Sequence, residues 1–102
     1  MIAFKNEIES IKQQIEARVK TKKIYLFGSC AKGIARHNSD IDLCVVMETM
    51  DKRKSVRELL LTLDYDRDLD IVVYTPEEWD KYYQDTSTFA NAIVRTGVKL
   101  SG

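Results

Sequence analysis

The segment that decides the fold spans residues 22–47 and reads KKIYLFGSCAKGIARHNSDIDLCVVM. Its first part, from Lys22 to Gly28, is a short run of β-type residues that stops at a glycine. In its last part, from Asp40 to Met47, the apolar residues Ile41, Leu43 and Val45 point to one face, and Asp40, Asp42 and Cys44 to the other. This alternation is typical of a strand with two different faces. We therefore expect two strands here, joined by a loop that Gly28 begins.

Helical patterns flank this segment on both sides. The first twenty residues predict a helix, because apolar residues recur there at three- and four-residue spacing: Phe4, Ile8, Ile11, Ile15 and Val19. Residues 52–63 carry a second apolar stripe of this kind, and Leu69–Tyr74 is strand-like. Because helices alternate with strands, we expect an α/β (α+β) fold with helices packed on a sheet. The sequence does not show the order of the strands.

Two further helices are expected near the C-terminus. Thr75 suits the N-cap position, Pro76 the first helical position, and Glu78 completes a capping box. A last helix is predicted from about Thr86 to Arg95, with Gly97 ending it. Three aromatic side chains lie at helical spacing in the first of these helices, and they either pack on the sheet or form a partner interface: Trp79, Tyr82 and Tyr83.

Length and charge limit the classes of function. The 102 residues fit one domain, 1–102, whose core needs no disulfide or structural metal. Lys and Arg number 16, as do Asp and Glu, and this balance argues against a protein that grips a long nucleic acid. No apolar run is long enough to span a membrane, and charges interrupt any secretion signal. Two cysteines without C-x-x-C spacing favour a cytoplasmic setting, and any metal is expected to have oxygen ligands.

Asp40 and Asp42 are the first candidates for such a metal site. Two residues apart on a strand, their carboxylates face the same side about 6.6 Å apart. At an effective dielectric constant near 20, two such charges repel by about 2–3 kcal/mol. A divalent cation between them relieves that repulsion, and hard oxygen ligands suit Mg²⁺. On the pair alone, the alternative of two solvated carboxylates at the start of a strand stays open.

The loop before these aspartates offers groups that bind anions. Gly28 and Ser29 follow a strand and precede helix-compatible residues, so their backbone N–H groups and the Ser29 hydroxyl can face a phosphate. Lys32 and Arg36 add positive charge nearby. Phosphate donors opposite a metal cradle are what a nucleoside triphosphate requires, because the metal bridges its phosphates to the protein. A Walker P-loop does not fit, because Ile34 stands where that motif needs lysine.

The pattern G-S-x10-D-x-D, formed by Gly28, Ser29, Asp40 and Asp42, resembles the signature of the nucleotidyltransferase superfamily that includes DNA polymerase β. The sequence of residues 27–43 is most similar to that of minimal nucleotidyltransferase (MNT) domains. The resemblance covers nearly the whole chain and implies a small mixed sheet with flanking helices. It also implies two Mg²⁺ ions, or Mn²⁺ in their place, held by three carboxylates.

The resemblance assigns roles to named residues. Asp40 and Asp42 bind both metals, and the third carboxylate, expected from Leu69–Val73, activates the attacking hydroxyl at the α-phosphate of ATP. We choose Asp70 for that role, with Asp68 as the competitor. The implied nucleotide-binding set includes the Gly-Ser pair and residues that support the phosphates or their loop: Gly28, Ser29, Lys32, Gly33, Arg36 and Ser39.

One departure from the family pattern is Cys30, because many relatives carry arginine after the Gly-Ser pair. If that arginine neutralises phosphate, Lys32 must compensate for its loss.

The resemblance also implies a partner. Relatives that modify tRNA or antibiotics carry a second domain for the acceptor, for which 102 residues leave no room. MNT proteins pair with helical HEPN toxins and act as antitoxins, in studied cases by transferring AMP to a toxin tyrosine. We therefore expect transfer of AMP from ATP to a HEPN partner. The alternatives are a non-catalytic antitoxin that acts by binding, and a free-standing enzyme acting on a small molecule or nucleic acid.

Overall fold

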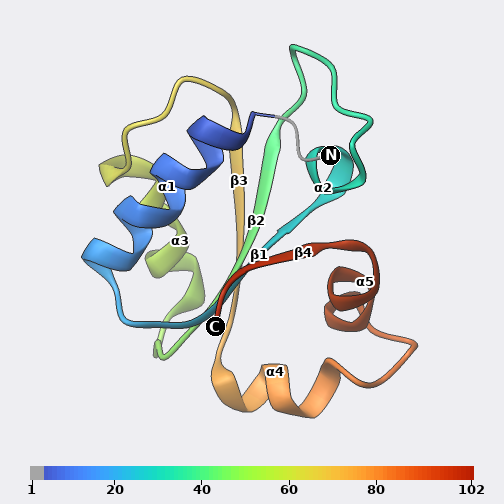
Figure 1. Ribbon diagram of the computed structural model, residues 1–102. Coiled ribbons are helices and arrows are strands. Elements are labelled where there is room, and N and C mark those ends of the chain that lie inside the picture. The colour runs from blue at the N-terminus through green and yellow to red at the C-terminus, as the bar shows by residue number, and fades with distance from the viewer. Residues whose placement is uncertain (1–3) are drawn as a thin grey trace.

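The computed structural model describes residues 4–102, which form five helices and four strands (Figure 1). In chain order the elements are α1 (Lys5–Arg18), β1 (Thr21–Phe27), α2 (Gly28–Lys32), β2 (Ile41–Met47), α3 (Lys52–Thr62), β3 (Leu69–Tyr74), α4 (Pro76–Tyr82), α5 (Phe89–Thr96) and β4 (Val98–Ser101). The predicted α+β class is confirmed. The helix expected over the first twenty residues is α1, and residues 1–3 of that prediction lie outside the described part.

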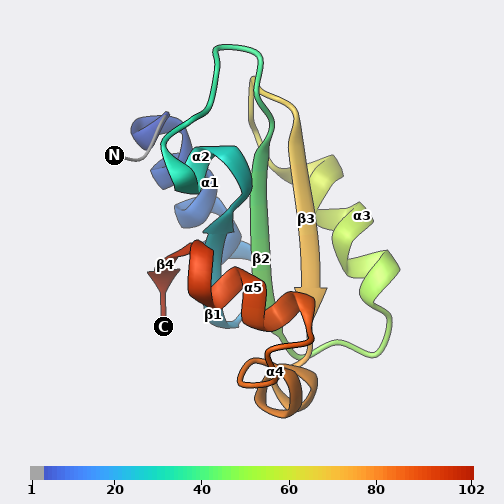
Figure 2. The same cartoon turned by 90° about the vertical axis from the view of Figure 1, so that its right-hand side faces the viewer.

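The four strands form one mixed sheet in the order β3-β2-β1-β4. Strand β1 pairs antiparallel with both β2 and β4, whereas β2 and β3 run parallel. A parallel pair requires a crossover, and α3 supplies it. The chain therefore leaves β2 at one end of the sheet and enters β3 at the opposite end, so that both strands begin at the same end of the sheet (Figure 2).

Helices cover the two faces of the sheet unequally. Helices α1 and α3 lie over one face and α4 and α5 over the other (Figure 1), whereas α2 follows β1 directly and buries Cys30 in the core of the first face. The first face holds the larger core, whose fully buried members include Ile11, Ile15, Leu26 and Leu43. The second face holds a smaller core around Trp79, which covers only part of the sheet. The part of this face left beside α2 carries the residues discussed below.

The packing interpretation of the aromatic stripe holds for two of its three members. Trp79 is 1% exposed and its ring lies 5.3 Å from both Tyr25 and Tyr74. Tyr83 stacks on Trp79, whereas Tyr82 is exposed. The predicted capping box at the start of α4 is present.

Two features of the C-terminal part differ from expectation. Helix α5 begins at Phe89, three residues beyond the expected start, because the Thr88 side chain accepts a hydrogen bond from the Asn91 N–H at 3.2 Å and so caps the helix there. Strand β4 was not expected at all. Its path depends on Gly97, where a Cβ atom would lie 2.5 Å from the backbone oxygens of Ile93 and Leu26. Glycine therefore lets the chain turn tightly against β1 and pair with it.

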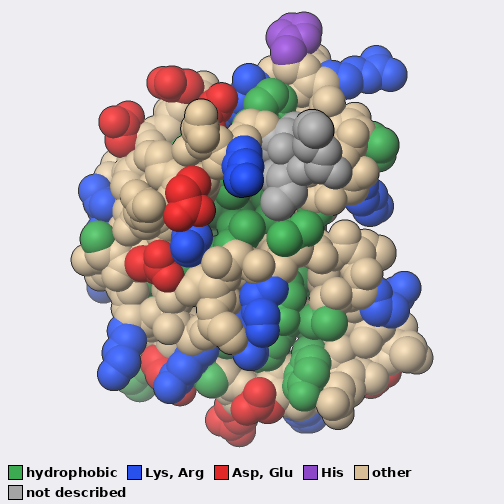
Figure 3. Space-filling model, viewed as in Figure 1, with side chains coloured by type: hydrophobic (Ala, Val, Ile, Leu, Met, Phe, Trp, Pro, Cys, Tyr) green, Lys and Arg blue, Asp and Glu red, His purple; other side chains and the backbone are tan. Residues whose placement is uncertain are grey.

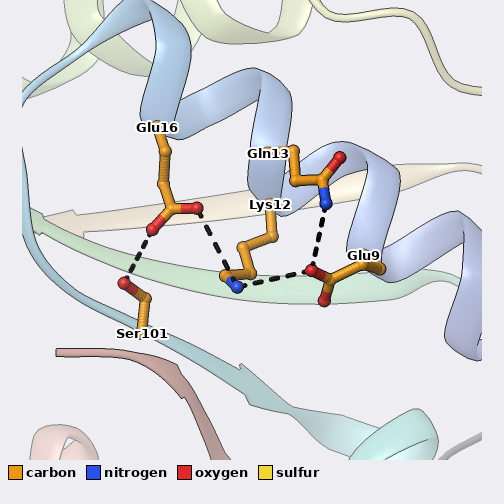
Figure 4. Close-up of polar contacts among 5 residues, drawn as sticks. All are labelled: Glu9, Lys12, Gln13, Glu16 and Ser101. Atoms are coloured by element: carbon orange, nitrogen blue, oxygen red, sulfur yellow. Dashed lines mark hydrogen bonds and ion pairs between the residues drawn. The ribbon is translucent and has the colours of Figure 1, made fainter.

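Strand β4 also contacts α1 through polar side chains (Figure 4). The Ser101 hydroxyl donates a hydrogen bond to the Glu16 carboxylate at 2.8 Å. Lys12 lies 3.9 Å from Glu16 and 3.4 Å from Glu9, which makes a short exposed network. Acidic and basic side chains are interspersed over this face of the molecule (Figure 3). Within residues 4–102, no helix has the length and apolar character needed to cross a membrane.

Candidate active site

Asp42 occupies the centre of the candidate site. It is the second residue of β2, and its Cα partners in the sheet are Phe27 on β1 and Asp70 on β3. Residues directly opposite each other on adjacent strands point to the same face. This is the face of the smaller core, since Phe27 packs against that core. The sheet therefore places the Asp42 and Asp70 carboxylates side by side on the part of the face that the helices leave open.

The other two candidate aspartates lie at the starts of the same strands. The strand was expected to begin at Asp40, but β2 begins at Ile41. Asp40 is exposed and is the last residue of the loop. Asp68 is also exposed and precedes β3, and its backbone carbonyl accepts a hydrogen bond from Ile41 N–H at 2.9 Å. Asp70 is thus the carboxylate in register with Asp42, and Asp68 lies on the turn.

The charges of Asp40 and Asp70 act on the Asp42 carboxylate. Burial is the largest cause that raises the pKa of Asp42 above its ordinary value, followed by the negative charges of Asp70 and Asp40. A carboxylate that is half-buried and faces two like charges is costly to ionise. Nearby positive charge, such as that of a bound cation, would lower this cost.

Two features of position 28 require glycine: its backbone conformation and its close approach to Asp42. Its φ of +74° lies in the left-handed region, which glycine adopts without steric cost. A Cβ atom built on Gly28 would overlap the Asp42 Oδ2 atom. The Asp42 carboxylate therefore packs directly against the backbone at the start of α2, where the first N–H groups have no partner within the helix.

The remaining candidates for nucleotide binding lie on α2 and on the loop after it. Ser29 is half-buried, Lys32 is exposed at the end of α2, and Gly33 ends the helix with a φ of +73°. Arg36 is exposed, and its N–H donates to the Ser39 hydroxyl at 2.8 Å. The Ser39 side chain thus stabilises the loop that precedes Asp40.

Cys30 faces away from this surface. It is completely buried in the larger core, and its thiol donates to the Asp40 carbonyl at 3.4 Å. Burial, followed by the charge of Asp42, raises the pKa of the Cys30 thiol. The Cys30 side chain therefore does not face the surface that carries Asp42, and Lys32 and Arg36 are exposed cations of this segment.

The chemistry of the donor set fits a divalent metal. Asp40, Asp42 and Asp70 offer only carboxylate oxygens, which are the ligands that Mg²⁺ and Mn²⁺ prefer. Across the described residues, no three His, Cys, Asp or Glu side chains already converge as a metal cluster. The observation that fits a cation here is the placement of Asp42 and Asp70 as partners on adjacent strands, with Asp40 directly before β2.

Three residues near the site were missed from the sequence. Phe27 and Phe89 form an edge-to-face pair beside Asp42, with ring centroids 5.4 Å apart. Arg67 forms an ion pair with Glu7 at 2.9 Å and donates a hydrogen bond to the carbonyl of His37, so it ties the loop that carries Asp40 to α1. No signal in the sequence identified Phe89, and Arg67 is hidden in an aspartate-rich turn.

Comparisons with known proteins identify the family to which this fold belongs. Residues 9–100 match the family model described as polymerase beta, nucleotidyltransferase. No curated protein gives a significant match. Among solved structures, the chain is similar to a candidate nucleotidyltransferase from Sulfolobus solfataricus, with 21% identity, a TM-score of 0.59, and coverage of 74% of this chain and 70% of that one.

The chain is also similar to a toxin–antitoxin structure that contains AMP-PNP. The identity is 27% and the TM-score 0.61, over 97% of this chain and 73% of the other. Both structures share the fold expected from the Gly-Ser and Asp-x-Asp pattern. The family-model match spans both motifs and Asp70, and it confirms the resemblance to the polymerase β-like superfamily. The chain belongs to the polymerase β nucleotidyltransferase family.

Proposed function

We propose that this protein is a Mg²⁺-dependent nucleotidyltransferase that transfers AMP from ATP to a HEPN toxin and so acts as its antitoxin. The observation that carries the proposal is the register of Asp42 with Asp70, directly beside Gly28 at the start of α2. This arrangement joins a concentrated negative charge to a turn whose N–H groups are free for phosphate. Metal and triphosphate together fit such a surface.

Each residue then has a chemical task. Asp40, Asp42 and Asp70 would hold two Mg²⁺ ions, or Mn²⁺, which neutralise charge on the triphosphate during transfer. Gly28 and Ser29 hold the terminal phosphates, and Lys32 adds positive charge. Asp70 takes the proton from the acceptor hydroxyl.

The bonds change in one displacement. The acceptor oxygen forms a bond to the α-phosphorus, and the bond from that phosphorus to the bridging oxygen breaks, so pyrophosphate leaves with the electron pair. The AMP group remains on the acceptor.

A protein acceptor is supported by one comparison. The similar toxin–antitoxin structure contains AMP-PNP, an analogue of ATP, and aligns with 97% of this chain at 27% identity. We extend the nucleotide and the toxin partner to this chain on that basis, and the HEPN class on the MNT resemblance of residues 27–43. We place the pair in the cytoplasm, where ATP is present and where the two buried cysteines stay as free thiols.

The test is label transfer from α-labelled ATP to a co-purified HEPN partner in the presence of Mg²⁺ or Mn²⁺. Asp42→Asn and Asp70→Asn are expected to lower the rate by about 10²–10⁴-fold, since each removes a group that acts on the reacting atoms. Asp68→Asn is the matched control, because it makes the same change at an exposed carboxylate directly before β3, two residues from Asp70. It is expected to transfer label at the wild-type rate.

Other outcomes separate the competing hypotheses. Loss of transfer in Asp68→Asn but not in Asp70→Asn would show that the third carboxylate is misassigned. If no label is transferred and Asp42→Asn still neutralises the toxin in cells, the protein is a non-catalytic antitoxin. Label on a small molecule or nucleic acid in place of the partner would identify a free-standing enzyme.

A further inference from the structure

Phe27 and Phe89 form an aromatic pair beside the acidic site. Phe27 is the last residue of β1, directly before Gly28, and it is the Cα partner of Asp42. Phe89 is the first residue of α5, and its ring meets that of Phe27 at 88° with centroids 5.4 Å apart. The pair therefore adjoins both the carboxylates and the turn proposed to hold phosphates.

Phe89 is held in place yet remains open to solvent. Its neighbours on α5, Ala90 and Ile93, are buried in the smaller core, whereas Phe89 is 51% exposed. Thr88 fixes the start of the helix, since its hydroxyl donates to the Tyr82 carbonyl at 2.8 Å and accepts from the Asn91 N–H. The edge-to-face contact with Phe27 sets the orientation of the ring. A half-exposed aromatic ring in a fixed position is suited to stacking with a planar group.

We propose that Phe89, supported by Phe27, stacks with the nucleobase of the substrate nucleoside triphosphate. The inference rests on the proposed function. It follows from the position of the pair. Gly28 and Ser29 would hold the phosphates, and Phe27, which directly precedes Gly28, contacts the Phe89 ring. A single molecule that carries phosphates and a flat ring can contact both parts.

The composition of the pair favours a base over a segment of the acceptor protein. The pair adjoins the turn proposed to hold the phosphates, and a nucleobase belongs to the same molecule as those phosphates. Neither ring carries a polar atom, so the pair can stack with a base but cannot form hydrogen bonds with its edge. We therefore expect ATP and GTP to bind with similar affinity and pyrimidine triphosphates to bind more weakly, because their rings offer less stacking area.

Calorimetry with two probes tests this inference in the presence of Mg²⁺. One probe is AMP-PNP, which has phosphates and base, and the other is inorganic tripolyphosphate, which has phosphates alone. Phe89→Ala and Phe89→Leu are expected to weaken AMP-PNP binding by about tenfold and to leave tripolyphosphate binding unchanged. Phe89→Tyr retains the ring and is expected to bind AMP-PNP as the wild type does.

Leu61→Ala provides the control, because Leu61 is also an exposed apolar side chain, 77% exposed, and it lies on α3 at the opposite face. It is expected to bind both probes normally. Thermal melts establish that each variant is folded, and the half-exposed position of Phe89 lets the leucine variant keep most of its packing.

Three results would overturn the inference. The first is unchanged AMP-PNP binding in Phe89→Leu, with or without loss of transfer to the acceptor. The second is equal weakening of both probes, which would mean that Phe89 acts by shaping the phosphate site. The third is that Phe89→Tyr fails to restore binding. If the wild-type protein binds neither probe, the proposed function itself fails, and this result is distinct from the other three.

Discussion

The contact between Gly28 and Asp42 gives a prediction that joins the fold to the site. Replacing Gly28 with alanine has two separate costs. The φ of +74° places alanine in the left-handed region, at a net cost of about 1 kcal/mol. The new Cβ also overlaps Asp42 Oδ2 and forces that carboxylate from its rotamer, at about 1 kcal/mol more. We expect Gly28→Ala to lower the free energy of unfolding by about 2 kcal/mol.

Gly33 is a matched control for the first cost. Its φ is +73°, and it is exposed at the end of α2. Gly33→Ala is therefore expected to cost only the conformational part, about 1 kcal/mol. For a chain of this size each kcal/mol lowers the melting temperature by about 4–8 °C, so calorimetric melts can separate the two variants.

A double-mutant cycle identifies the source of the difference. In an Asp42→Ala background the carboxylate is absent, and Gly28→Ala is expected to cost no more than Gly33→Ala. The coupling energy between positions 28 and 42 should then be about 1 kcal/mol. Equal melting temperatures for Gly28→Ala and Gly33→Ala in the wild-type background would refute the close approach of Asp42 to the turn.

Two further predictions concern the charges around the site. Burial and two neighbouring carboxylates raise the pKa of Asp42 in the folded protein. The contribution of Asp42 to the free energy of unfolding is therefore fully present below its ordinary pKa of 3.8, and it is lost as the pH rises through the raised pKa of the folded state. Asp42→Asn should therefore be more stable than the wild type at neutral pH and equal to it at pH below 3.8, as urea denaturation at both pH values will show; lower stability at neutral pH would contradict this. Arg67→Ala removes the ion pair with Glu7 and the cation–π contact over the Phe4 ring at 3.4 Å, and we expect a loss of about 1–2 kcal/mol in the same assay. A variant as stable as the wild type would show that Arg67 does not hold the loop.

The sequence predicted those parts of the structure that depend on local patterns. The apolar spacing of Ile8, Ile11 and Ile15 indicated α1, and the cap at Thr75 indicated α4. The short run from Leu69 to Tyr74 indicated β3 and made Asp70 a candidate. Each of these features is decided by neighbours within a few residues, where propensity and spacing carry the information.

Features that depend on distant contacts were not predicted. Strand β4 exists because Gly97 permits close approach to the Leu26 carbonyl, which lies far away in the sequence. The side chain of Phe89 meets Phe27 only after the second face of the sheet has formed. The burial of Cys30 likewise depends on the core between the sheet and α1. No local pattern contains these contacts.

The central claim is that the acidic face and the Gly-Ser turn carry out nucleotidyl transfer. The most direct measurement incubates the wild-type protein and its HEPN partner with ATP labelled in either the α-phosphate or the γ-phosphate. The α-label should appear on the partner, and the γ-label should appear only in released pyrophosphate. Retention of the γ-label on the partner would indicate a kinase reaction, and the absence of both labels from the partner would contradict the claim.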